Sequence, residues 1–179
     1  FYAEDQVIFE SKVDEMGEAS FQPNIYIGNN APGMLKANFV TKVFEEGGDF
    51  SIDRSSIDYS PYNSYVGVSV PKGTLYGNTL VTGKDHIIDI ATVDLEGNPL
   101  SVNNVDVKVY KVSWKWWWDS YDNSIANYIA KSSTIPILET KVNTSSGKGS
   151  FKLRVNQPEW GRYLVRITDP KSGHTTGKI

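Results

Sequence analysis

Hydrophobic and polar positions alternate with a period of two along most of the chain, which is typical of β-strands buried on one face. The clearest examples are residues 151–155 and 163–167, where aliphatic or aromatic residues alternate with Lys and Arg, except that position 164 is Leu. No long stretch places apolar residues at the i, i+3, i+4 and i+7 positions of an amphipathic helix. The pattern therefore predicts an all-β protein with antiparallel sheets.

Clusters of Gly, Pro, Asn and Ser separate the alternating segments and act as turn signals. The densest boundary signal is 71–83, which contains a proline and three glycines. We expect the domain boundary there, giving two tandem Ig-like β-sandwich domains over 1–78 and 79–179. The expected strands are 6–13, 19–27, 34–45, 50–58, 62–70, 86–93, 105–118, 134–143, 151–155 and 163–167.

Four of the five tryptophans lie within one expected strand, at Trp114, Trp116, Trp117 and Trp118. Each can bury about 150 to 250 Å², so the cluster could cover the end of a domain or contact its neighbour. We favour such a packing or interface role, and we place Trp160 in the same candidate interface. The alternative is an exposed platform for sugar rings or a partner protein.

The inward face of this strand changes along its length. The valines of 105–109 occupy odd positions, whereas Trp114, Trp116 and Trp118 occupy even positions. A single extra residue in one strand shifts the parity in this way. We therefore predict a bulge or sharp twist near Tyr110 and Lys111, with the tryptophans covering one end of the β core.

Composition excludes several classes of function. The chain has 179 residues, a net charge of −3 and no cysteine, so it has no disulfides, thiol nucleophile or Cys-based zinc site. There is no basic stripe for nucleic acid and no apolar run long enough to span a membrane. The chain begins without Met or a signal peptide, and we interpret it as a fragment of a longer protein.

Candidate chemistry is sparse. His86 enters an expected strand and His174 lies in a C-terminal tail, where we expect it to be solvated. No Gly-x-Ser-x-Gly elbow accompanies them. The acidic stretch 119–123 lacks the glycine and distal glutamate of a calcium loop, and 45–49 is more typical of a solvated turn. We therefore predict no catalytic, cofactor or metal residues and no enzyme activity.

A structural motif is indicated at Gly161-Arg162-Tyr163, which opens the last clear strand. In Ig-like sandwiches a tyrosine at this position donates its hydroxyl to the backbone a few residues upstream, forming a tyrosine corner. We therefore assign Gly161 and Tyr163 structural roles.

Several segments together resemble the bacterial α2-macroglobulin family. They are the run 38–53 with the Tyr-Ser-Pro-Tyr of 59–62, the approach to the tryptophans at 107–110, and the C-terminal stretches 159–163 and 169–173. The resemblance covers nearly the whole chain. It implies macroglobulin domains ahead of the bait-region domain, the fifth and sixth of the bacterial type.

The resemblance implies a periplasmic, cell-envelope or secreted parent that traps proteases after they cut its bait region. Many members also carry a Cys-containing thioester, which this chain lacks because it has no cysteine. No functional residue of the family can be placed on this sequence. The implied role is a scaffold whose partners are neighbouring macroglobulin domains and, through the parent, proteases. The alternatives are a carbohydrate-binding module and an adhesin built from tandem β-sandwiches.

Overall fold

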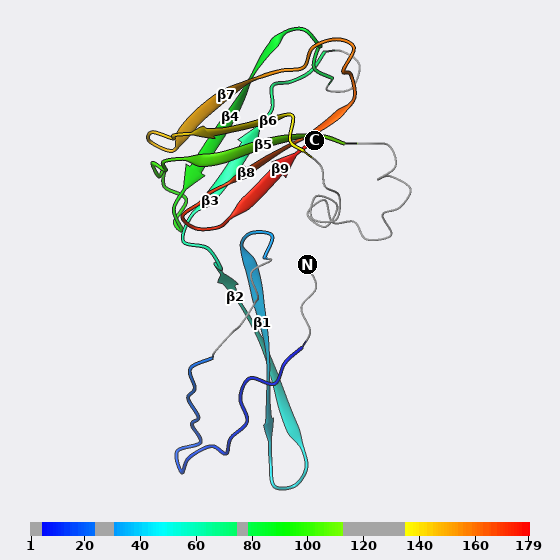
Figure 1. Ribbon diagram of the computed structural model, residues 1–179. Coiled ribbons are helices and arrows are strands. Elements are labelled where there is room, and N and C mark those ends of the chain that lie inside the picture. Colours follow the sequence, from blue (N-terminus) through cyan, green and yellow to red (C-terminus); the bar gives the residue numbers. More distant parts are fainter. Residues whose placement is uncertain (1–4, 24–30, 75–78, 113–134) are drawn as a thin grey trace. The chain divides into compact units, whose positions relative to one another are not determined.

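The computed structural model describes residues 5–23, 31–74, 79–112 and 135–179. The chain divides into two compact units, Phe1–Pro61 and Tyr62–Ile179. The described residues contain nine strands and no helix (Figure 1). The all-β class predicted from the alternation is therefore confirmed.

Unit 1 contains one antiparallel hairpin, formed by β1 (Leu35–Phe44) and β2 (Phe50–Tyr59). The register runs without interruption from Leu35↔Tyr59 to Phe44↔Phe50. Both strands lie where the sequence predicted them, and the acidic loop between them is a tight turn in which the Glu45 amide donates to the Asp49 carbonyl. Most of the hairpin's side chains are exposed.

The predicted strands 6–13 and 19–27 are wrong in their described parts, because residues 6–13 and 19–23 form no strand. Between them the chain reverses at a turn, where Asp14 Oδ1 accepts from the amides of Met16 and Glu18. The rings of Phe9 and Phe21 stack at 4.3 Å. Alternation alone does not produce a strand without a neighbour to pair with. The described residues of unit 1 therefore show a hairpin and not a complete sandwich.

The described residues of unit 2 form a seven-stranded antiparallel sandwich (Figure 1). One sheet has the order β3-β4-β7 and the other the order β6-β5-β8-β9. The chain crosses from one sheet to the other after β4, after β6 and after β7, which gives the Ig-like arrangement. The strands are β3 (Tyr65–Ser69), β4 (Asp85–Val93), β5 (Val105–Val112), β6 (Leu138–Val142), β7 (Lys148–Arg154), β8 (Arg162–Thr168) and β9 (Thr175–Lys178).

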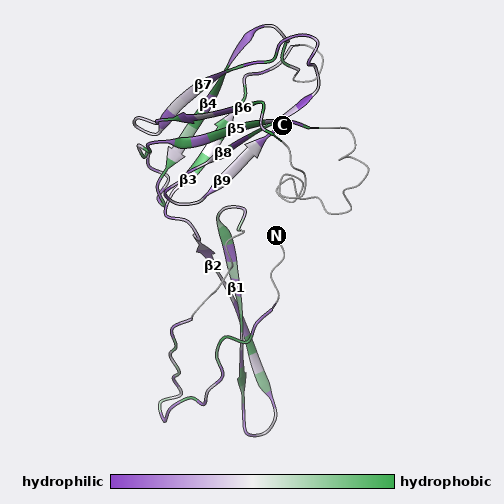
Figure 2. Ribbon diagram, in the orientation of Figure 1, coloured by the Kyte–Doolittle hydropathy of each residue, from purple (hydrophilic) through white to green (hydrophobic). Residues whose placement is uncertain are grey.

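The core lies between the inward faces of these two sheets. Ile88 and Ile90 of β4 face Val105, Val107 and Val109 of β5, and all five are almost completely buried. Figure 2 shows the corresponding hydrophobic residues in green along β5. The intervening residues of β4 are exposed. The alternation seen in the sequence is therefore the alternation between core and solvent.

The predicted bulge near Tyr110 and Lys111 is wrong. The β5–β8 register continues without a break from Asp106↔Thr168 to Val112↔Arg162. Tyr110 pairs with Leu164, and both are buried on the face of the sheet opposite to Val109. The sheet thus buries residues on both faces at this point, so the change of apolar parity needs no extra residue.

The loops at one end of the sandwich are joined by buried hydroxyl groups. The hydroxyls of Thr92 and Thr144 lie 2.7 Å apart. Thr144 also accepts from the Val102 amide, and Thr92 donates to the Leu100 carbonyl. Nearby, Gly147 has φ of +75°, and a Cβ there would lie 2.7 Å from Cβ of Pro99. The turn after β6 is therefore tightly packed.

The division between the units falls earlier than the predicted boundary in 71–83. β3 pairs with β4 from Tyr65↔Val93 to Ser69↔Asp89, so it belongs to the second sandwich. β9 was not predicted, because its Thr-Thr-Gly-Lys sequence has no apolar alternation. It is an edge strand that pairs with β8 alone.

The neighbouring isoleucines of β4 provide a test of the core. Ile88 is fully buried, whereas Ile87 is 46% exposed. We expect Ile88→Ala to lower the free energy of unfolding by about 2–5 kcal/mol, because it removes buried methylenes and leaves a cavity. Ile87→Ala should change it by less than about 0.5 kcal/mol. Urea unfolding measures both, and equal effects would contradict this packing.

Candidate functional site

Among the described residues, no group of three or more His, Asp or Glu side chains could hold a metal ion. The two histidines are held by different parts of unit 2. His86 Nε2 lies 2.8 Å from the Val81 carbonyl, whereas His174 contacts β3. The acidic stretch 119–123, which lacks the pattern of a calcium loop, lies outside the described residues.

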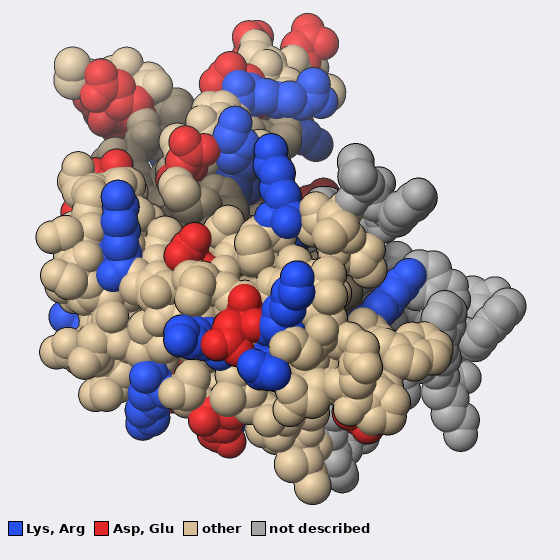
Figure 3. Space-filling model, turned by 90° about the horizontal axis from the view of Figure 1, so that it is seen from above, with Lys and Arg blue, Asp and Glu red and all other residues tan. Residues whose placement is uncertain are grey.

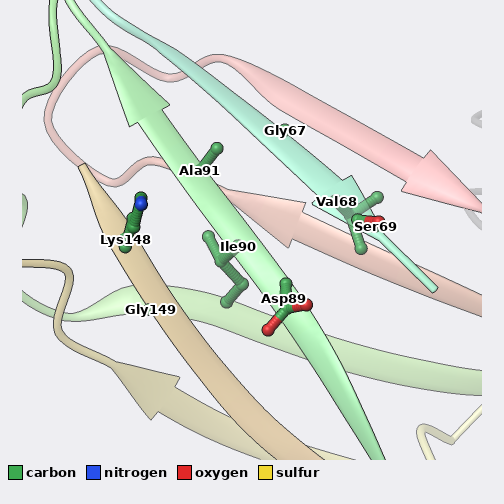
Figure 4. Close-up of a pocket in the computed structure, with 8 residues that line it drawn as sticks. All are labelled: Gly67, Val68, Ser69, Asp89, Ile90, Ala91, Lys148 and Gly149. Carbon is green, nitrogen blue, oxygen red and sulfur yellow. The ribbon is translucent and has the colours of Figure 1, made fainter. Parts of the chain in front are cut away.

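The outer face of the β3-β4-β7 sheet carries a shallow, open depression of about 550 Å³ (Figure 4). Its floor is formed by small residues, including Gly67 and Ala91, and Asp89 and Lys148 lie at its margins. Ligand sites combine an enclosed apolar pocket with convergent polar groups. This depression is an open sheet surface and has neither property.

The charged surface is mixed in sign. On the face shown in Figure 3, acidic and basic side chains are interspersed. Ion pairs join Lys108 to Glu139 at 2.8 Å and Lys141 to Asp106 at 3.9 Å across β5 and β6. The described residues include no helix that could span a membrane.

Among the described residues of unit 2, Trp160 is a strongly exposed aromatic residue, with 73% of its surface accessible. It lies in the loop between β7 and β8. The loop backbone is fixed, because the Trp160 amide donates to the Pro158 carbonyl at 2.8 Å and the Glu159 amide donates to Asn156 at 2.9 Å. The Glu159 carboxylate forms an ion pair with Lys111 of β5. The indole is therefore presented to solvent from an ordered corner.

Tyr163 completes this corner. Its hydroxyl donates to the backbone carbonyl of Glu159, four residues upstream, which is the bond expected of a tyrosine corner. Gly161 between them has φ of +154°, and a Cβ there would lie 3.4 Å from Cε of Lys111. A positive φ favours glycine, because it has no side chain.

The predicted interface residues Trp114, Trp116, Trp117 and Trp118 lie outside the described residues. The described part of β5 ends at Val112, which pairs with Arg162. Arg162 is two residues from Trp160. The sheet therefore brings Trp160 near the point where the described chain stops before the tryptophan-rich segment.

A second ordered site joins the start of β3 to the turn between β8 and β9. Asp169 is fully buried in that turn. Its Oδ2 accepts from Ser64 Oγ at 2.5 Å and Ser172 Oγ at 3.0 Å, and its Oδ1 accepts from the Lys171 amide at 2.8 Å. Burial by itself raises the pKa of Asp169, but these hydrogen bonds outweigh it and hold the pKa below its ordinary value.

His174 lies at the end of the same turn and is buried, so the prediction that it is solvated is wrong. Its Nδ1 accepts from the Val66 amide at 3.1 Å. The ring makes edge contacts with Tyr65 and Tyr62, at centroid distances of 4.8 and 5.1 Å. Burial, with a smaller contribution from Tyr65, raises the pKa of the Tyr62 phenol. His174 is buried because β9 brings it back against β3.

The sequence analysis did not predict the site formed by Asp169 and His174. In the Ser64–Asp169 hydrogen bond the two residues are 105 positions apart in the chain, and in the Val66–His174 bond they are 108 positions apart. A local signal was present, since Asp169 followed by Pro170, Lys171 and Ser172 is typical of an Asp-initiated turn. That signal predicts the turn but not its contact with β3.

The seven-stranded sandwich with its tyrosine corner defines unit 2 as an Ig-like domain. A family model described as bacterial macroglobulin domain 6 matches residues 67–179, which is more than half of the chain. The chain therefore belongs to the bacterial macroglobulin family, and the resemblance noted in the sequence is confirmed for this part. No curated protein and no solved structure matches it.

The tyrosine corner can be tested by Tyr163→Phe. The substitution keeps the ring and removes the hydroxyl that donates to Glu159. We expect the free energy of unfolding to fall by about 0.5–1.5 kcal/mol, as for one intramolecular hydrogen bond. Urea unfolding monitored by circular dichroism measures the change, and an unchanged midpoint and slope would show that the bond does not stabilise the loop.

Asp169 makes stability depend on pH in a defined direction. Because its folded pKa lies below the ordinary value of 3.8, its contribution is complete above that value and is lost as the pH falls through the folded pKa. At neutral pH, Asp169→Asn should cost about 1–3 kcal/mol, because an amide nitrogen cannot accept the hydroxyl bonds. It should also flatten the fall in stability below about pH 4.

The matched control is Asp89→Asn, at an exposed carboxylate on β4. We expect a change below about 0.5 kcal/mol at neutral pH. Urea unfolding of the wild-type protein and both variants across the acid range distinguishes the effect of Asp169→Asn from that of Asp89→Asn. Equal destabilisation by the Asp89 and Asp169 substitutions would contradict the conclusion that the hydrogen bonds of the buried Asp169 carboxylate stabilise the fold.

Proposed function

We propose that this chain is a non-catalytic scaffold segment of a bacterial α2-macroglobulin-like protease inhibitor. The observation that carries the proposal is the match of residues 67–179 to bacterial macroglobulin domain 6. It is supported by the seven-stranded sandwich and by the lack of a metal-binding cluster among the described residues. In this proposal the parent protein is secreted or lies in the cell envelope, and it traps proteases after bait cleavage.

The proposal assigns unit 1 to a second macroglobulin domain preceding this one. Its hairpin exposes hydrophobic side chains on both strands, including Val40, Phe44, Phe50 and Ile52. An isolated two-stranded hairpin is marginally stable in water. Further strands of the same domain would bury these side chains. This burial would explain why the side chains are hydrophobic.

Trp160 is proposed as a contact between this domain and a neighbouring macroglobulin domain, together with Trp114, Trp116, Trp117 and Trp118. Tryptophan is enriched among the residues that dominate binding energy at interfaces. The ordered backbone around Trp160 supports this role, because a side chain held in place before binding loses less conformational freedom on docking.

Protease trapping is tested on the full-length parent protein with a broad-specificity protease. We expect cleavage at one defined site, after which the protease still hydrolyses small peptides but no longer digests large proteins. Methylamine incorporation would separate a covalent trap from a noncovalent one. Scattered cleavage with undiminished digestion of proteins would overturn the proposal, and binding to glycans or cell surfaces would then be examined.

The contact role predicts a difference between the isolated chain and the parent. Because Trp160 is largely exposed here, Trp160→Ala should change the free energy of unfolding of this chain by less than about 0.5 kcal/mol. In the full-length parent it should weaken domain docking by about 2 kcal/mol and lower the melting temperature. Calorimetry of both proteins measures this difference.

Leu95→Ala is the control, since Leu95 is also an exposed apolar side chain, on the turn after β4. It should leave both proteins unchanged. If Trp160→Ala has no effect in the parent, Trp160 is not an interdomain contact. Loss of glycan binding by Trp160→Ala would instead favour the carbohydrate-binding alternative.

A further inference from the structure

The first residues of unit 2 form hydrogen bonds with the turn between β8 and β9. The chain passes from unit 1 to unit 2 at Pro61–Tyr62. Within the next four residues, Ser64 donates to Asp169 and Val66 donates to His174. The turn itself is closed by the Asp169 amide, which donates to the His174 carbonyl at 2.9 Å. We refer to Ser64, Val66, Asp169, Ser172 and His174 as the junction latch.

One bond of the junction latch depends on the protonation state of its histidine. The Val66 backbone N–H is the donor, so His174 Nδ1 must carry a lone pair and no proton. An imidazolium has a proton on both ring nitrogens and can accept no hydrogen bond. Protonating His174 therefore breaks the bond to Val66 and places two donors against each other in a buried site.

Among the described residues, titratable side chains lie near His174 on β3 and on the turn between β8 and β9. Tyr62 and Tyr65 contact the ring from the β3 side. On the turn, Asp169 is ionised and its oxygens are occupied by Ser64, Ser172 and the Lys171 amide. The Lys171 residue is exposed.

β3 is held by one neighbouring strand and by the core contacts of Val66, in addition to the junction latch. It has five residues and lies at the edge of its sheet, paired with β4 alone. Edge elements with few hydrogen bonds open at lower free energy than the core of a protein. Loss of the Val66–His174 bond should therefore release the start of β3 while the sheets around Ile88 and Val107 stay intact.

We propose that the junction latch responds to the protonation of His174. Neutral His174 holds the start of β3 in place, and protonated His174 releases it. Mild acid then frees the chain that connects unit 2 to unit 1, without unfolding unit 2. This response to pH does not depend on the proposed protease trapping, because it requires only the contacts inside unit 2.

The test is amide hydrogen exchange measured by NMR on the 179-residue chain, at about pH 7.5 and pH 5.5, on either side of the ordinary imidazole titration. Exchange rates are converted to protection factors, since intrinsic exchange also changes with pH. We expect the protection of the Val66 amide to fall about tenfold at the lower pH, as for loss of one buried hydrogen bond. The Ile90 amide in the central strand β4 should keep its protection.

The decisive variant is His174→Asn. The Asn side-chain oxygen can occupy the position of Nδ1 and accept from Val66, but it does not titrate. Protection of Val66 should then be the same at both pH values. Because the chain has only two histidines, His86→Asn is the matched control and should retain the wild-type response.

Imidazole nitrogen chemical shifts give a second readout that does not depend on the variants folding. At about pH 7.5, near the upper end of the ordinary titration range, Nδ1 of His174 should have the shift of an unprotonated nitrogen. A protonated Nδ1 at that pH, an unchanged Val66 protection factor in the wild-type protein, or a response that persists in His174→Asn would each overturn the proposal.

Discussion

The structure of unit 2 depends on the burial of two alternating faces against each other. Ile88 and Ile90 from one sheet meet Val105, Val107 and Val109 from the other, and removing these side chains from water supplies the main driving force for folding. Each strand contributes only every second residue to this layer. The outward residues are therefore available for ion pairs, turns and contacts with other domains.

One end of the sandwich is closed by two groups of polar side chains, because the start of β3 pairs with the end of β4. In the first group, the Thr92 and Thr144 hydroxyls satisfy the backbone of the crossing loops. At the start of β3, the Asp169 carboxylate and the His174 ring perform the same task. Buried hydroxyls are neutral over the whole ordinary pH range, whereas a histidine is not. The two groups therefore differ in their sensitivity to acid.

The chain belongs to the bacterial macroglobulin family. A fold by itself does not define a function, which depends on the residues that the fold presents at its surface. Among the described residues, Trp160 in the loop before β8 and several apolar residues of the β1–β2 hairpin are exposed.

The sequence by itself determined the all-β class and most strands of unit 2, because burial on one face imposes a period of two that is visible without coordinates. It also indicated the tyrosine corner, since Gly161 and Tyr163 are close in the chain. It misplaced the start of unit 2 and predicted a bulge at Tyr110, because pairing partners and burial on a second face are not encoded locally. Only the tertiary structure decided that β9 exists and that His174 is buried, because both follow from contacts with strands distant in sequence.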